Sequence, residues 1–265
     1  MKWAHRMLVT CDAHYKHRLP CQRKTFAPSV CAHYFVEDQA LVNRLTVNTQ
    51  LFTCMVYVTS DVSFPTLIKD AQCFHAIRNC DNPTTLGLLY DPGAQHKYGA
   101  FKRACFGHVD LPVLGSNSVV IKQCFYNCLA TGKMLPYENH SQVAKLSSEI
   151  NCLRWASALM GLVYDHIDKH IAEHGPPPTF SVPRMRFVKS ALAVMQESHD
   201  TFLLEEVIDE GVEGHFVKYI GNGSAWPFDF LADEEMHRAK FLSFCQHLQY
   251  VKTKSNAYVG DFQGE

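Results

Sequence analysis

The sequence predicts an α+β fold, and two observations carry this prediction. Runs of β-branched and aromatic residues typical of strands occur at several places, beginning with residues 51–59. From about residue 142 to 174, apolar residues recur at the three- and four-residue steps of a long amphipathic helix. With 265 residues, 47% of them hydrophobic and 19% charged, the chain is long enough for one bilobed globular unit with a proper core.

The first strands follow an irregular stretch that covers residues 1–50. Beyond the strand at residues 51–59, a loop-rich stretch leads to two further predicted strands, at residues 97–109 and 116–126. In the second of these, side-chain alternation places Lys122 on one face among apolar neighbours. A lone cation therefore interrupts an otherwise apolar strand.

The long helix should end by about His174. Gly175 can take the left-handed conformation that closes a helix, and the prolines at positions 176–178 cannot continue the backbone ladder. After it, residues 184–198 are predicted to form another, shorter helix.

The last part of the chain is predicted to contain both element types. Residues 201–208 and 214–220 have the composition of strands, and an acidic helix is expected from about residue 233 to 246. Residues 248–252 and 257–262 are predicted to form a terminal hairpin around a polar turn.

Lys122 and Glu149 form the first candidate site. A strand lysine followed by a helix glutamate is a common arrangement for binding nucleotide phosphates, because the carboxylate orients the long lysine stem. A strand-edge lysine and a solvated helix glutamate would account for the same pattern.

Composition argues against several other classes of protein. The net charge of -1 names no partner, and although residues 1–30 are basic, no base-reading motif accompanies them, so nucleic acid is not expected as a partner. No apolar run approaches the roughly 18 residues of a membrane helix, and no secretory signal is evident. We therefore expect a cytoplasmic or nuclear protein, not associated with membranes, whose 11 cysteines are reduced thiols.

Two further groups have the composition of metal ligands. His166, His170 and His174 recur every four residues, so two of these rings could share a metal, although a solvated helix face explains them as well. Cys124 and Cys128 are too few for a zinc site, and packing in the core is the simpler interpretation of Cys124.

Several short sequence blocks occur in an order that is typical of one protein family. The histidine before an aromatic-containing strand, the K-Y-x-x-N-G block and the final D-x-Q-G follow one another as they do in the alpha-kinase family, which residues 95–265 resemble, most closely in its fungal branch. The blocks are GAFKRA (99–104), VVIKQCF (119–125), LLEEVIDEG (203–211), HFVKYIGNG (215–223), FLSFCQHLQYVKT (241–253) and YVGDFQG (258–264).

The resemblance implies an ATP-dependent protein serine/threonine kinase. It implies an atypical kinase-like fold, with an antiparallel-sheet N-lobe and a long helix, then the start of an incomplete C-lobe; residues 1–94 would be of uncertain structure and part of the N-lobe. In the family's terms, Lys122 would bind the phosphates and Lys102 would lie near them. Glu206, or its neighbour Glu205, would be the hinge acid beside the adenine.

Asp261 and Gln263 match the family's acidic and amide pair at the phosphate and magnesium end of the cleft. Oxygen ligands suit Mg²⁺, and strand alternation would put both residues on one face. Lys218, Tyr219 and Asn222 match the K-Y-x-x-N block, with a role left open, while Gly221 and Gly223 would permit a tight backbone path.

The family's zinc site and catalytic aspartate are only partly represented. His247 resembles one zinc ligand, but the other ligands and the threonine-aspartate-proline segment would follow residue 265. Two alternatives stay open: an active kinase acting on a protein substrate, or a catalytically inactive nucleotide-binding or scaffold module. We also expect residues 240–265 to be exposed and poorly supported.

Overall fold

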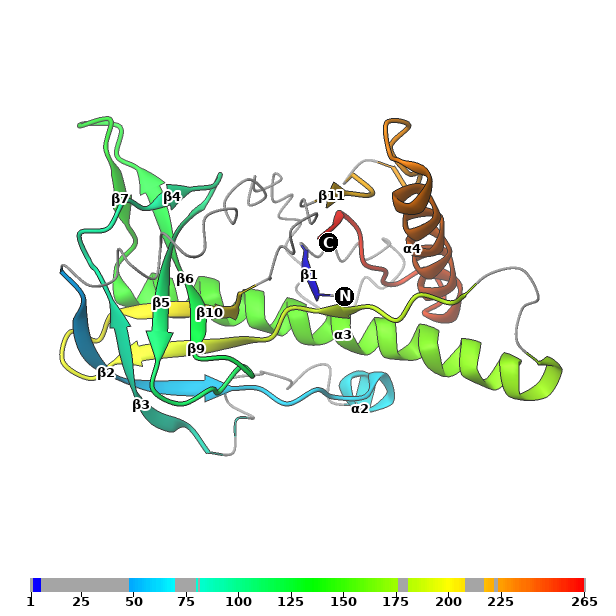
Figure 1. The fold of residues 1–265 in the computed structure, drawn as a ribbon, viewed down its shortest axis with the longest axis horizontal. Helices are drawn as coiled ribbons and strands as arrows, with labels where there is room; N and C mark the ends of the chain where they lie inside the picture. The colour runs from blue at the N-terminus through cyan, green and yellow to red at the C-terminus, as the bar shows by residue number, and fades with distance from the viewer. Residues whose placement is uncertain are drawn as a thin grey trace.

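The computed structural model describes residues 48–69, 80, 82–175, 181–207, 217–221 and 224–264, and the backbone of residues 2–5. Strands and helices are mixed along the chain, which confirms the α+β prediction (Figure 1). The elements are β1 (Lys2–His5), β2 (Gln50–Val58), α2 (Phe64–Lys69), β3 (Thr84–Tyr90), β4 (Lys97–Tyr98), β5 (Lys102–Val109), β6 (Ser118–Asn127), β7 (Met134–Pro136), α3 (Asn139–His174), β8 (Arg186–Phe187), β9 (Ser190–Met195), β10 (Thr201–Glu206), β11 (Val217–Lys218), α4 (Asp233–Lys252) and β12 (Phe262–Gly264).

Six of the strands close into a barrel. They pair in the order β5-β3-β2-β9-β10-β6, and β6 pairs with β5 again, with every pairing antiparallel. Short β4 and β7 extend the ladder at β5 and β6. Closure removes free strand edges. The antiparallel sheet was expected, but its closure was not, because it depends on pairings between strands far apart in sequence.

Alternate residues of each strand point into the barrel and away from it. The inward residues make one apolar core, and the outward residues of β6, β9 and β10 pack against α3. We call these the inner face and the outer face. The main inner-face residues are Cys54, Val56, Leu86, Leu88, Cys105, Val109, Val119, Ile121, Ala191, Ala193, Met195, Phe202 and Leu204.

Helix α3 runs along the barrel and continues past it toward α4 (Figure 1). It covers the predicted range 142–174 and begins three residues earlier. It ends at His174 as predicted, and the Gly175 N–H donates to the carbonyl of Ile171 at 2.8 Å. Gly175 has a φ of 83° and a ψ of 167°, a conformation that favours glycine but differs from the expected left-handed helical one.

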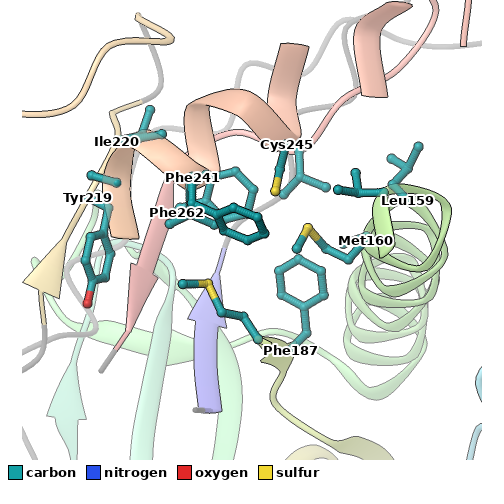
Figure 2. Close-up of a cluster of buried hydrophobic side chains, with 14 of the residues drawn as sticks. Leu159, Met160, Phe187, Tyr219, Ile220, Phe241, Cys245 and Phe262 are labelled. Atoms are coloured by element: carbon teal, nitrogen blue, oxygen red, sulfur yellow. The ribbon is translucent and has the colours of Figure 1, made fainter. Parts of the chain in front are cut away.

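A second core lies where α3 and α4 meet the small sheet of order β11-β12-β1-β8. Figure 2 shows Leu159 and Met160 of α3 facing Cys245 of α4, with Phe187 below. Phe187 stacks on Phe262 with ring centroids 6.5 Å apart. We call this group the C-terminal core.

Two predicted elements are wrong. Residues 184–198 form β8 and β9 instead of a helix, because β9 pairs with both β2 and β10 and is buried on both faces. Those pairings outweigh the local helix propensity of its alanines. Residues 248–252 continue α4 instead of forming a strand, since Leu248 extends the buried stripe of Phe241, Leu242 and Cys245 at helical spacing.

The terminal hairpin is therefore absent, and the carboxyl-terminal segment is packed where an exposed one was expected. Val259, Phe262 and Gln263 are buried, and β12 is flanked by β11 and β1. Gln249 fixes the approach to β12, because its Oε1 accepts a hydrogen bond from the Val259 N–H at 2.8 Å. Within the ranges that the structure describes, no helix is both long and apolar enough to cross a bilayer.

Candidate functional site

The register of β5 and β6 puts two lysines on the outer face. Lys102 lies opposite Cys124, and Lys122 lies opposite Ala104, so the two lysines are diagonal neighbours on the same side of the ladder. Cys124 packs with Leu146 and Ile150 of α3, which identifies this side as the one beneath the helix. Two cations are thus brought together under an apolar cover.

Lys122 forms an ion pair with Glu205. Leu203 lies opposite Lys122 in the ladder between β6 and β10, and Glu205 follows two residues later on the same face. The side chains are only 9% and 8% exposed. The amine at the centre of the predicted site is therefore held inside the protein by a carboxylate.

Lys102 forms an ion pair with Glu149, which comes from α3. The sequence suggested that Glu149 would orient Lys122, and this pairing is corrected: the ion pair of Glu149 is with Lys102, while Lys122 pairs with Glu205. The lysine side chain is 10% exposed and the glutamate 30% exposed. A strand lysine and a helix glutamate do form an ion pair, but the lysine is Lys102 and not Lys122.

Gln142 fixes the start of α3 against β6. Its amide nitrogen donates to the Cys124 carbonyl at 2.6 Å, and its Oε1 accepts from the Cys124 N–H at 3.0 Å. Burial raises the pKa of the Cys124 thiol to about 11, and Lys102 opposes this rise. Cys124 is accordingly a neutral residue of the core, as the sequence suggested.

Buried charges are unusual enough to need an explanation. Removing an ammonium and a carboxylate from water costs several kcal/mol for each ion, and their attraction rarely offsets more than that cost. Apolar side chains of similar size would stabilise this face at least as well. Stability alone therefore does not explain why the two ion pairs are present.

Glu206 points to the other side of β10 from Glu205. It is 4% exposed, and its carboxylate accepts hydrogen bonds from Arg186 Nη2 at 3.0 Å and from the Lys189 N–H at 2.8 Å. These contacts tie the end of β10 to the segment that enters β9. Of the two adjacent glutamates, Glu205 is the one beside Lys122.

Asp261 and Gln263 lie next to Lys218. Gln263 is opposite Lys218 in the β11–β12 ladder, and Asp261 Oδ1 is 2.9 Å from Lys218 Nζ. Asp261 is 1% exposed and has a φ of 56°, in the left-handed region that aspartate tolerates better than most residues. Neither Oδ1 nor Oδ2 makes a hydrogen bond within the described ranges, so the contact with Lys218 is an ion pair only.

Of the remaining family-matched residues, Tyr219 is fully buried in the C-terminal core, and a side chain at Gly221 would meet the ring of Phe228 at 3.1 Å. A packing role accounts for both. Asn222 and Gly223 lie outside the described residues. His247 is exposed on α4.

The histidines of the long helix do not form a metal cluster. His170 and His174 stack with their ring centroids 4.3 Å apart. Across the residues that the structure describes, no group of three or more His, Cys, Asp or Glu side chains is placed to hold a metal ion. Neither the histidine stripe nor His247 has further ligands there.

Sequence reasoning missed three of these contacts. The Lys122–Glu205 pair could have been found by aligning β6 with β10, since both strands were predicted. Lys218 as the partner of Asp261 and Lys102 as the partner of Glu149 depend on tertiary packing, for which the sequence carries no local signal. No protein-family model matches the chain, and no curated protein matches it.

Proposed function

We propose that this chain binds ATP and acts as a protein serine/threonine kinase of the alpha type. The observation that carries the proposal is the pair of buried lysines on the outer face, each held by a carboxylate. The order of the alpha-kinase-like motifs supports the same function. The barrel with α3 would be the N-lobe of a kinase-like fold, and the C-terminal core would begin its C-lobe.

The lysines supply the chemistry that ATP requires. A lysine amine is a compact cation that binds phosphate oxygens, and a neighbouring carboxylate holds its flexible stem in place. Protein kinases use a strand lysine and a helix glutamate for this task. Lys122 would bind the phosphates with Glu205 as its orienting acid, and Lys102, positioned by Glu149, would add a second cation near them.

Asp261 and Gln263 offer oxygen donors for magnesium. The buried Oδ2 of Asp261 lacks a partner in the described part of the chain, and a carboxylate with an amide oxygen suits a Mg²⁺ ion whose other ligands are water and phosphate. Lys218 Nζ forms an ion pair with Oδ1, although Oδ1 makes no hydrogen bond within the described residues either. Magnesium bound by these residues would neutralise phosphate charge.

Nucleotide binding is tested by calorimetric titration of the purified chain with Mg–ATP. We expect binding to weaken about tenfold or more in Lys122→Met, because a hydrogen bond to a charged group contributes about 1.5–3 kcal/mol. Lys122→Met leaves Glu205 buried without its cation, so Lys122→Met/Glu205→Gln is measured alongside to separate lost binding from lost folding. Lys133→Met, at an exposed lysine, is the matched control.

Two results would contradict the proposal: wild-type protein that does not bind Mg–ATP, or a folded double variant that binds it as well as the Lys133→Met control does. Transfer of radiolabelled phosphate to a protein acceptor then distinguishes the two forms of the function. Transfer lost in Lys122→Met indicates a kinase, and binding without transfer indicates an inactive nucleotide-binding module.

A further inference from the structure

A cavity of about 660 Å³ lies on another side of α3 from the lysine pair. Its walls are the segment between β2 and α2, the middle of α3, and the segment that runs through β8 into β9. Neither Lys102 nor Lys122 lines it. The volume is within the roughly 300–1,000 Å³ of small-molecule sites.

Three buried polar groups of the wall lack hydrogen-bond partners. Thr59 Oγ1, Arg154 Nε and Ser190 Oγ are inaccessible to solvent, and no partner exists for them among the described residues. The three residues are 7%, 6% and 1% exposed. An unpaired buried polar group costs about 1–3 kcal/mol, so these three groups would gain from a bound partner, either water or a ligand.

One edge of the Arg154 guanidinium makes no hydrogen bond within the described residues. Both hydrogen bonds of Arg154 within the described residues come from Nη1, which donates to the Thr59 carbonyl at 3.1 Å and to Asp61 Oδ1 at 2.7 Å. Nε and Nη2, the two donors on the other edge of the guanidinium, form the planar fork that matches two oxygens of a carboxylate or phosphate. Burial lowers the pKa of Arg154 and Asp61 opposes this, yet an arginine stays charged in proteins.

The rest of the wall is apolar. Leu114, Met160 and Val188 contribute side chains, so a ligand with a charged head would also find a place for a hydrophobic body. Of the charged groups in the lining, Arg154 pairs with Asp61, and Arg186 pairs with Glu206 just outside it. Lys189 and Asp165 remain, so the charges balance, and selection of an anion depends on the unpaired edge of Arg154.

Gly161 opens the wall on the α3 side. A Cβ added there would meet no packed heavy atom within 4 Å in the described structure. Glycine costs a helix interior roughly 0.5–1 kcal/mol relative to alanine, and no tight packing requires it here. A larger residue at this position would project into space next to the cavity.

We infer that this cavity binds a small organic anion, with a carboxylate or phosphate head on the Arg154 fork, hydroxyl contacts from Thr59 and Ser190, and an apolar body against Met160 and Val188. The site is separate from the proposed nucleotide site.

The test uses the whole chain and fluorine NMR of 4-fluorophenylacetate and 4-fluorophenyl phosphate, with 4-fluorobenzyl alcohol as the neutral analogue. We expect at least one anion to bind, and the alcohol to bind about tenfold more weakly or worse, because it cannot pair with the guanidinium. The anion that binds more tightly shows whether the cavity prefers a carboxylate or a phosphate head group. Equal binding of the alcohol, or no line broadening by any probe at millimolar concentration, overturns the inference and leaves water as the occupant.

Three variants locate the binding. Gly161→Leu should abolish it by filling the space, while Gly161→Ala should retain it and raise the melting temperature. Ser190→Ala should weaken it about threefold to tenfold without loss of stability, since the hydroxyl makes no protein hydrogen bond in the described structure. Binding unchanged in a folded Gly161→Leu protein would place the anion elsewhere.

A last variant separates this inference from the proposed function. Lys122→Met/Glu205→Gln removes the central ion pair of the proposed nucleotide site and should leave anion binding unchanged. If the anion is lost in this variant, it was occupying the phosphate position of the nucleotide site, and the inference fails even where the proposed function stands.

Discussion

The inner and outer faces of the barrel are made by the same strands, yet they differ in chemistry. On β6, Val119 and Ile121 point inward into an apolar core, while Lys122, between Ile121 and Gln123, points outward to Glu205. On β10, Leu204 points inward and Glu205 outward. Successive residues of one strand therefore lie in different environments, one in an apolar core and the next in a buried ion pair.

We assign stability of the fold to the inner face and the proposed function to the outer face. The inner face follows the ordinary rule that a core excludes charge, and its packing explains the fold. The outer face is also buried, by α3, but it retains two ion pairs that a stable fold does not need. The following predictions test this separation, from the largest effect to the smallest.

Glu205→Leu should cost about 3–5 kcal/mol of unfolding free energy, because it leaves the Lys122 ammonium buried without a partner. Lys122→Met/Glu205→Leu should recover most of that loss. Urea denaturation of both variants measures the effect. If the double variant is as unstable as the single one, the ion pair is needed for folding and the separation of the two faces breaks down.

Leu204→Ala, on the inner face, should cost about 2–5 kcal/mol, since the closed barrel can collapse only partly around the lost side chain. Mg–ATP affinity, measured where the variant is folded, should not change. A selective loss of ATP binding in this variant would show that the inner face also contributes to the nucleotide site.

Alkaline pH should destabilise the inner face. Burial raises the pKa of Cys54 and of Cys105 to about 12, against an ordinary value of 9.0. The neutral thiols stabilise the folded protein below pH 9, and this contribution is lost between pH 9 and about 12 as the unfolded chain ionises first. Each thiol should lower stability by about 1.4 kcal/mol at pH 10.

The measurement for the thiols is urea denaturation at pH 8, 9 and 10. Cys105→Ala should flatten the decline above pH 9 by the share of one thiol. An unchanged slope in this variant would mean that Cys105 does not stay protonated in the folded barrel.

Arg184→Ala should have the smallest effect. Arg184 pairs with Asp168 at the surface, where both side chains are about half exposed, 54% and 52%. Solvent screens such pairs, so the urea midpoint should stay within experimental scatter of the wild type. A loss as large as that in Glu205→Leu would remove the contrast between exposed and buried ion pairs.

The sequence predicted what depends on local pattern. The range 142–174 and the stop at Gly175 were found because helix periodicity and capping are properties of neighbouring residues. The mixed α+β class followed from the same kind of signal. Residues 184–198 were predicted as a helix because nothing in that segment reveals that it will be a central strand of a barrel.

The candidate site shows the same limit. The chemistry-bearing residues Lys102, Lys122 and Glu149 were recognised by type, but the partner of each lysine was not, since it depends on strand register and on where α3 crosses the barrel. The unpaired edge of Arg154 gave no sequence signal at all. Its position beside a cavity depends on residues 58–64 and 185–190, which pack around it in the folded protein.

Helix α3 links the two cores. Leu146 and Ile150 pack against the outer face of the barrel, and Leu159 and Val163 belong to the C-terminal core about three and a half turns further along the 36-residue helix. An uninterrupted helix is stiff along its length, so the distance between the cores is fixed.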